Sequence, residues 1–386
     1  MSAIFLDVSR LLSRHIGGKF PTGVDRVGLE YIRHYQQRQP TRAVLSESGY
    51  SAVLSEALSS RAFDMLLQQD FSTKAAARRL IVAATRRLLS RDHFPRGTLL
   101  HTSHSGLEQR YLRSMHKRGL RSVIMVHDLI PLTHAEYCRP EVDKIHRTRI
   151  HAALTHASGI IANSQFTLDS LKVEARAANL PMPPAVVAHL ASGIKPFERA
   201  PRPIPAPYFV LLGTIEPRKN HWFLLHVWRR LVEQLGSAAP KLVVIGRRGW
   251  ECENVVDMLE RCEALKGVVI EEASCSDERL RNYLQHAQAL LFPSFVEGYG
   301  MPLAEALALQ VPVLASDIDV FHEIADDIPE YIDPLDGLGW LSHIKEYAQP
   351  ESPARAAQLD RVRRFREPTW ARHFEQVDNF IGSLGA

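Results

Sequence analysis

Two glutamates stand eight positions apart in FPSFVEGYGMPLAEA, residues 292–306. Glu297 and Glu305 flank a loop with Gly298 and Gly300, which leads into an alanine-rich segment of helical composition. A carboxylate binds a sugar diol well, because each oxygen can accept a hydroxyl proton in a charge-assisted hydrogen bond. The glycines allow a sharp turn that brings backbone amides near an anion or a sugar hydroxyl. The pair could therefore hold two sugars of one ligand, or Glu305 could simply face the helix dipole.

A second candidate loop is GTIEPRKN, residues 213–220, which follows an apolar run and precedes a helix-like segment. The N-terminus of a helix offers free N–H donors and a partial positive charge. Arg218 could bind a diphosphate through a bidentate fork, and Lys219 could add a point charge. We expect this loop to bind phosphate, and the alternative is a loop with two surface cations. The glycines of GRRGW, residues 246–250, could also let a ligand approach the backbone.

In the first half of the chain, VHDLIP places His127 and Asp128 directly after an apolar run. A histidine at the end of a strand could donate or accept a proton near neutral pH, whereas the alternative is a surface or packing role. The segment HIGGKFPTGVDRVGLEYI, residues 15–32, could close over a phosphate or an acceptor, or it could be a flexible loop. Its candidate residues are Gly17, Gly18, Gly23 and Arg26. In ANSQFT, Asn163 and Ser164 are good N-cap residues for the next helix, and a functional role is the alternative.

The elements that must position these loops alternate along the chain. Short apolar runs such as SVIMVHD, KLVVIG and ALLFPS are typical of buried parallel strands, and helix-like segments separate them. This alternation predicts α/β units with right-handed crossovers. The proline-rich stretch at residues 195–207 divides the chain into similar halves. We therefore expect two Rossmann-like doubly wound domains facing a central cleft, with ligands at the carboxyl ends of the strands.

The charge of the chain is unevenly distributed. The net charge is +4, but residues 74–121 hold twelve Lys or Arg against two Asp or Glu. Within this run Arg78, Arg79, Arg86 and Arg87 are separated by apolar residues, as in a basic amphipathic helix. Such a helix can lie on an anionic membrane surface, and the alternative is an ordinary solvated face. A nucleic-acid partner is not expected, because the run lacks aromatic residues for base stacking.

Other broad classes are disfavoured by composition. No window of about 18 residues is apolar enough to predict a transmembrane helix, and MSAIFLDVSR lacks the pattern of a signal peptide. The cysteines are scattered without metal-ligand spacing, which indicates reduced thiols: Cys138, Cys252, Cys262 and Cys275. We therefore expect a cytoplasmic protein, peripheral to the inner face of the cytoplasmic membrane if the basic helix binds there.

GTIEPRKN and FPSFVEGYGMPLAEALALQVPVLASDIDVFHEI together resemble glycosyltransferase family 4, a family of retaining enzymes with the GT-B fold. The resemblance is most specific over residues 208–335, and in the first half it extends to TGVDRV, VHDLIP and ANSQFT. TWARHFEQVDNFI resembles the closing helix of the family. The resemblance implies an acceptor-binding domain, a linker, a nucleotide-sugar-binding domain and a helix crossing back to the first domain, at residues 1–195, 196–207, 208–366 and 367–386.

The resemblance also implies roles for single residues. Glu297 would contact the transferred sugar, and His127 would lie near the reacting sugar. Glu305 would hold the ribose of the donor. Arg218 and Lys219 would bind the diphosphate, so the reaction would need no metal. The other donor-binding residues would be Gly213, Gly298, Tyr299, Gly300, Met301, Pro302 and Leu303.

Gln310 is a departure from the family pattern, which has glycine there. Asp317 and Asp319 read as a D-x-D metal motif, but they follow the strand expected after the two glutamates, so we expect no metal there.

VHDLIP with GTIEPRKN further resembles bacterial mannosyltransferases of polysaccharide assembly. This implies GDP-mannose as the donor, no cofactor, and a saccharide or lipid-linked oligosaccharide as the acceptor. A GT-B sugar-nucleotide epimerase or hydrolase is an alternative, but the loops of the first half show no clear set of extra acidic groups. A non-catalytic module that binds nucleotide-sugar or membrane is a second alternative, and the intact candidate residues argue against it.

Overall fold

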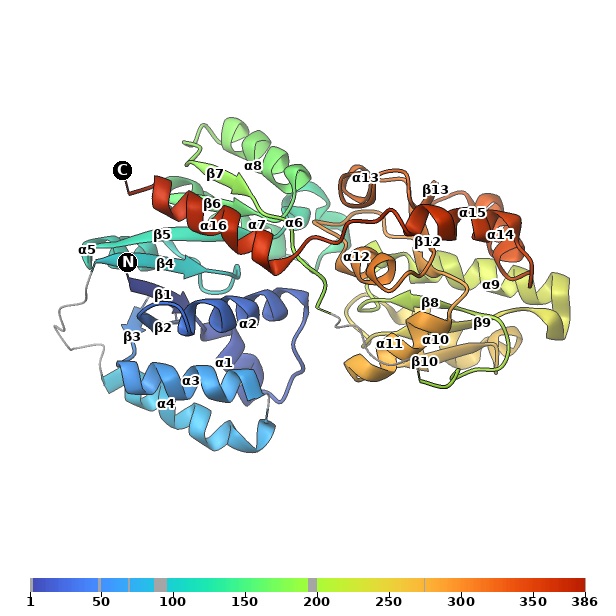
Figure 1. Cartoon of the computed structure of the whole chain (residues 1–386), viewed down its shortest axis with the longest axis horizontal. Helices are drawn as coiled ribbons and strands as arrows, with labels where there is room; N and C mark the ends of the chain where they lie inside the picture. Colours follow the sequence, from blue (N-terminus) through green and yellow to red (C-terminus); the bar gives the residue numbers. More distant parts are fainter. Residues whose placement is uncertain are drawn as a thin grey trace. The chain divides into compact units, whose positions relative to one another are not determined.

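The computed structural model describes residues 3–47, 50–68, 70–86, 96–193, 200–273 and 275–385. The chain forms two compact units, and each contains a sheet covered by helices (Figure 1). The first unit comprises Met1–Leu132, Glu141–Leu190 and Thr369–Ala386. The second unit comprises Thr133–Pro140 and Ala191–Pro368. The pattern of apolar runs does not predict that the short segment Thr133–Pro140 belongs to the second unit.

The sheet of the first unit has the order β3-β2-β1-β4-β5-β6-β7. Only β2 and β3 pair antiparallel among these neighbours. Phe5 and Leu99 face each other in the register of β1 and β4, and both side chains are fully buried, as the apolar runs predict. The strands are β1 (Ala3–Asp7), β2 (Thr41–Glu47), β3 (Tyr50–Val53), β4 (Gly97–His101), β5 (Leu120–Val126), β6 (Gly159–Ala162) and β7 (Ala185–Val187).

The helices of the first unit connect these strands in the manner of a Rossmann-like fold. Ser164 caps α8 as predicted, because its hydroxyl accepts a hydrogen bond from the Thr167 N–H at 3.0 Å. The helices are α1 (Ser9–Ile16), α2 (Gly23–Gln36), α3 (Glu56–Gln68), α4 (Lys74–Arg86), α5 (Gln109–Lys117), α6 (Ile130–Thr133), α7 (Val142–His156) and α8 (Gln165–Ala177).

The C-terminal helix α16 (Trp370–Ser383) also belongs to the first unit. Tyr31 and His373 share a hydrogen bond of 2.9 Å, and the Tyr35 hydroxyl donates to Asp378 at 2.6 Å. The ring of Phe374 packs edge-on against Tyr31 with centroids 5.0 Å apart. The helix therefore covers the aromatic side of α2.

The sheet of the second unit is entirely parallel and has the order β10-β9-β8-β11-β12-β13. The strand order reverses between β8 and β11, and this is the point where open α/β sheets bind ligands. The strands are β8 (Tyr208–Leu212), β9 (Lys241–Ile245), β10 (Val269–Glu272), β11 (Leu290–Phe292), β12 (Val313–Ser316) and β13 (Glu330–Ile332).

Two buried tryptophans anchor the helices of the second unit. Trp228 donates its indole N–H to the Pro240 carbonyl at 2.9 Å, and Trp340 donates to the Asp333 carbonyl at 3.0 Å. The helices are α9 (His221–Leu235), α10 (Glu253–Arg261), α11 (Asp277–His286), α12 (Met301–Ala308), α13 (Asp319–Ala325), α14 (Gly337–Tyr347) and α15 (Pro353–Val362). Two Rossmann-like α/β domains are thus confirmed as the fold class.

Candidate active site

The loops that follow β8 and β11 meet at the switch point of the second sheet. Pro217 begins the short 3₁₀ turn Pro217–Lys219, since its fixed φ suits a first helical position. Asn220 ends the turn in the left-handed region with φ of 58° and leads into α9. This local geometry directs Arg218 and Lys219 toward the β11 loop, where the Phe295 N–H donates to the Arg218 carbonyl at 2.9 Å.

Glu297 is the centre of a buried polar cluster. Arg218 Nη1 donates to Glu297 Oε2 at 2.7 Å, and Lys219 Nζ contacts Oε1. Ser294 Oγ also donates to Oε1 at 2.8 Å. The Glu297 residue is only 6% exposed, so these charge-assisted bonds replace the solvation that the carboxylate loses.

A second carboxylate completes the cluster. Glu216 Oε1 lies 2.6 Å from Arg218 Nε, and the Glu216 side chain is buried. The Lys219 ammonium also lies 4.8 Å above the ring of Phe292, within the range of a cation–π contact. Two cations and two carboxylates therefore share one site, and their formal charges balance.

The protonation states follow from burial and charge. Burial by itself would raise the pKa of Glu297, but the Arg218 and Lys219 cations hold that pKa at about 2. Burial lowers the pKa of Lys219, although Glu297 opposes that change. Burial also raises the pKa of Glu216 above its usual value. Glu297 is therefore an ionised acceptor at neutral pH and cannot serve as a proton donor.

The loop after Glu297 turns at Gly300, which has φ of +94° and precedes the first residue of α12. A Cβ there would lie 2.8 Å from the Phe321 ring, so glycine is required for both conformation and space. Met301, Pro302 and Leu303 form the first turn of α12, and Tyr299 is buried. Glu305 lies on the same helix and is 4% exposed. The structure thus places all the donor-binding candidates of this stretch on one continuous loop and helix.

The glycines of GRRGW have a packing role. A Cβ at Gly246 would lie 1.9 Å from the Gly213 carbonyl oxygen, and one at Gly249 would lie 2.6 Å from the Ile215 oxygen. Ile215 also pairs with Arg248 in an isolated parallel bridge. These glycines therefore let the loop after β9 pack against the loop that carries Arg218.

In the first unit, His127 directly follows β5 and is buried. Its ring Nε2 donates to the Thr102 carbonyl at 2.8 Å. Its backbone N–H donates to His104 Nε2 at 3.2 Å. Burial lowers the pKa of His127, so the ring is neutral at pH 7. A proton on Nε2 leaves Nδ1 as the acceptor of the neutral ring. Asp128 accepts a hydrogen bond of 3.1 Å from the N–H of Ile130, the first residue of the short helix α6.

The glycine loop between α1 and α2 is organised around Asp25, which sequence analysis did not select. Its oxygens lie 2.7 Å from Arg10 Nε and 2.6 Å from Arg14 Nε. The Thr22 N–H and hydroxyl both donate to it, at 2.7 and 2.6 Å. The capping-box spacing of Thr22 and Asp25 is the signal that could have identified this residue.

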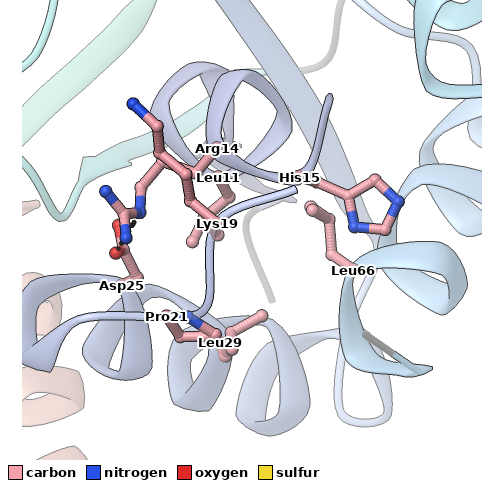
Figure 2. Close-up of a pocket in the computed structure, with 8 residues that line it drawn as sticks. All are labelled: Leu11, Arg14, His15, Lys19, Pro21, Asp25, Leu29 and Leu66. Carbon is pink, nitrogen blue, oxygen red and sulfur yellow. Dashed lines mark ion pairs between the residues drawn. The ribbon is translucent and has the colours of Figure 1, made fainter. Parts of the chain in front are cut away.

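Figure 2 shows Arg14 and Asp25 beside each other on one side of a small pocket, which is also lined by His15 and Leu66. The four candidate residues of this glycine loop lie in different local settings. Gly18 has φ of +64°, Gly17 ends α1, and Gly23 and Arg26 lie in the first turn of α2.

The first part of the basic run, Lys74–Arg86, forms helix α4, on which Arg78 and Arg79 are exposed. Val82 is 53% exposed on the same helix. The side chain of Arg86 and all of Arg87 lie outside the described residues. In the described part of the chain, no helix is both long and apolar enough to cross a membrane.

Three further sequence features have defined positions. Gln310 adopts φ of +60°, the left-handed conformation that glycine tolerates best. Asp317 pairs with His322 at 2.7 Å, and Asp319 begins α13. The four cysteines are free thiols.

Glu216, Ser294 and His221 are the residues of the second unit that sequence analysis missed. The first two stand inside the quoted motifs, beside residues that were selected. His221 is buried at the start of α9, and neither ring nitrogen has a hydrogen-bond partner within the described residues. No local sequence pattern distinguishes it from the other histidines.

One family of known proteins matches the part of the chain that carries the loops after β8 and β11. Residues 195–328 match the family of glycosyl transferases group 1. O-antigen chain mannosyltransferase B of Escherichia coli is 27% identical over 67% of this chain and 69% of its own length. The serotype-specific mannosyltransferase WbdA of Escherichia coli is 27% identical over 62% of this chain and 32% of its own length. This chain therefore spans about a third of the length of WbdA.

Solved structures extend the likeness to the whole chain. The Anabaena protein HepE, solved in complex with UDP, has a TM-score of 0.61 at 14% identity. The comparison covers 99% of this chain and 100% of that one. The chain thus carries a region that matches group 1 glycosyl transferases, on a fold shared with solved GT-B glycosyltransferases.

Proposed function

We propose that this protein is a retaining glycosyltransferase that transfers mannose from GDP-mannose to a saccharide acceptor in the synthesis of a surface polysaccharide. The acceptor would be lipid-linked, and the reaction would need no metal or other cofactor. The O-antigen mannosyltransferases among its relatives support the sugar and the pathway class. The UDP complex of HepE supports a nucleotide-sugar as the donor.

The cluster of Arg218, Lys219 and Glu297 at the switch point is the observation that carries this proposal. A donor diphosphate would share the N–H donors of the two cations with Glu297. The positive charge would stabilise the diphosphate as it leaves, which is the largest electrostatic demand of the reaction. Glu297 would then have oxygens available for hydroxyls of the transferred sugar, and Glu305 would accept hydroxyls of the ribose.

The first unit would supply the acceptor side. His127 would lie near the reacting sugar, with Asp128 beside it. Gly17, Gly18, Gly23 and Arg26 would form the loop near the acceptor. Because His127 is neutral with its proton on Nε2, its Nδ1 would accept a hydrogen bond and would not protonate the leaving group. The leaving phosphate would therefore assist removal of the acceptor proton.

The experiment is calorimetric titration of the purified protein with GDP-mannose, UDP-glucose and UDP-N-acetylglucosamine. We expect tight binding of GDP-mannose, which Glu305→Ala abolishes and the exposed control Glu278→Ala retains. Selective binding of UDP-glucose or UDP-N-acetylglucosamine would contradict the proposal that GDP-mannose is the donor. Failure to bind any of the three would contradict the proposed site.

Product analysis separates the alternative chemistries. With a mannose-containing oligosaccharide as acceptor, we expect an α-linked product from the α-configured donor, as NMR of the anomeric proton would show. Release of free mannose at the same rate with and without acceptor would instead indicate a hydrolase. Conversion of the donor into another sugar nucleotide would indicate an epimerase.

We also propose that α4 lies on an anionic membrane surface and so brings the enzyme to a lipid-linked acceptor. The exposed Arg78 and Arg79 supply positive charge, and the exposed Val82 supplies an apolar side chain on the same helix. This combination is typical of helices that lie in a membrane interface.

A further inference from the structure

A short segment of the chain leaves the first unit and packs in the second. Thr133–Pro140 belongs to the second unit, whereas the residues on both sides of it belong to the first. Its centre is a single 3₁₀ turn, Ala135–Tyr137. Such a turn has little stability of its own, so the contacts of its side chains must hold it in place.

The main contact of this segment is a ring stack. Tyr137 lies parallel to Phe295, with centroids 5.3 Å apart and an interplanar angle of 4°. His134 stacks with Tyr137 at 6.1 Å and 11°. Offset parallel rings at these separations are a favourable aromatic arrangement. Phe295 is half-buried, whereas its neighbours Ser294 and Val296 are buried. The stack with Tyr137 therefore covers part of a ring that would otherwise be more exposed.

A second loop also holds the segment. The Trp250 indole N–H donates to the Tyr137 carbonyl at 3.2 Å, and the Arg139 guanidinium lies 5.6 Å from the centre of the Trp250 ring. Tyr137 is therefore fixed on one side by the loop after β9. Its ring can act as a rigid surface for the loop after β11.

Phe295 belongs to the stretch that holds Glu297. Its N–H donates to the Arg218 carbonyl, and the adjacent Val296 carbonyl accepts from Arg218 Nη1 at 3.2 Å. The same Nη1 donates to Glu297. A displacement of Phe295 would therefore move both the Arg218 backbone contact and the carboxylate two residues further on.

We propose that Tyr137 is a positioning residue that holds the Phe295–Glu297 loop in the conformation that binds the donor. This inference rests on the proposed function. The planar ring of Tyr137 makes this contact. Tyr137→Phe would retain the ring stack, whereas Tyr137→Leu would retain apolar area but lose the stacking with Phe295. The loop would then occupy more conformations, and donor binding would have to restore order to it.

The test measures the donor affinity of the full chain by calorimetry with GDP-mannose. We expect Tyr137→Leu to weaken binding by about 2- to 12-fold, the range for loss of one aromatic pair. Tyr137→Phe should bind within about 2-fold of the wild type, as expected for retention of the stack. Glu136→Gln, an exposed change in the same turn, should leave the affinity unchanged. Thermal unfolding of each variant shows whether it is folded at the temperature of the titration.

The Phe295→Leu variant tests whether Tyr137 acts on donor binding through Phe295. It also replaces Tyr137→Leu in the test if that variant does not fold. It should weaken binding to a similar extent, and adding Tyr137→Leu to it should cause little further loss. Full additivity of the two losses would overturn the inference, and so would unchanged affinity in folded Tyr137→Leu or Phe295→Leu. If the wild type binds no nucleotide-sugar, the proposed function itself fails. Wild-type binding with unaffected variants removes only the role of Tyr137.

Discussion

Arg218 Nη1 lies 2.7 Å from Glu297 Oε2, so residues 79 positions apart in sequence form one buried ion pair at the switch point of the second sheet. This pair joins the loop after β8 to the loop after β11. The Arg218 side chain is 20% exposed, whereas that of Glu297 is 8% exposed. The arginine side chain is therefore the more exposed member of the pair.

Removing Arg218 should weaken both ligand binding and the site. We expect Arg218→Ala to reduce the affinity for GDP-mannose by about 1.5–3 kcal/mol, the scale of a charge-assisted hydrogen bond. Calorimetry measures this change, and Arg261→Ala, an exposed arginine on α10, is the matched control. The variant should also unfold at a lower temperature, because Glu216 and Glu297 lose a buried partner. An affinity equal to that of the wild type would remove Arg218 from the donor site.

The low pKa of Glu297 predicts a specific loss of stability in acid. Its pKa falls from a usual value of 4.5 to about 2 in the folded protein. A depressed carboxylate pKa stabilises the fold above the unfolded value, and this contribution disappears as the pH falls from 4.5 toward 2. Urea unfolding across that range should therefore show a steeper decline for the wild type than for Glu297→Gln. Parallel curves for the two proteins would show that the pKa of Glu297 is not depressed.

Gln310 offers a test of backbone strain. Residue 310 has φ of +60°, a conformation that glycine adopts with less strain than glutamine. We therefore expect Gln310→Gly to raise the free energy of unfolding of the protein by about 0.5–1 kcal/mol. Denaturant unfolding measures the change. Ala357→Gly, an exposed change inside α15, should have the opposite sign and a similar size. Destabilisation by Gln310→Gly would mean that the contacts of the Gln310 side chain stabilise the fold by more than the left-handed backbone conformation destabilises it.

The membrane proposal can be tested on the exposed arginines of α4. Neutralising both Arg78 and Arg79 with glutamine should weaken binding to phosphatidylglycerol-containing vesicles by about 2 kcal/mol, about 1 kcal/mol for each charge. Cosedimentation with vesicles measures the bound fraction, and added salt should weaken wild-type binding. The exposed pair Arg229 and Arg230 on α9 provides an equal change of charge in the second unit. Equal binding by the α4 variant and the wild type would contradict the proposal.

The sequence predicts the strands well because burial on both faces leaves a local signature. KLVVIG and SVIMVHD become β9 and β5, and both strands lie inside their sheets. The loops with Arg218 and Glu297 could be selected for the same reason, since each directly follows such a run. Ser164 shows that a capping interaction within four residues is equally readable.

Contacts between distant segments leave no such signature. The stack of Tyr137 on Phe295 joins residues from opposite halves of the chain, and neither residue stands in a pattern that indicates the other. The glycines of GRRGW are similar, because the backbone of a different loop, rather than a ligand, explains them. Asp25 is an intermediate case, since its capping box is local but its arginine partners lie on another helix.

The position of α16 has a consequence for the order in which the protein folds during synthesis. The ribosome completes the rest of the first unit at Leu190, but the helix that covers Tyr31 and Tyr35 begins only after Thr369. At roughly 5–20 residues per second, this interval lasts about 10–35 s. The nascent first unit must persist for that time with an uncovered aromatic surface. Protection of this surface until α16 is synthesised would therefore favour the native protein.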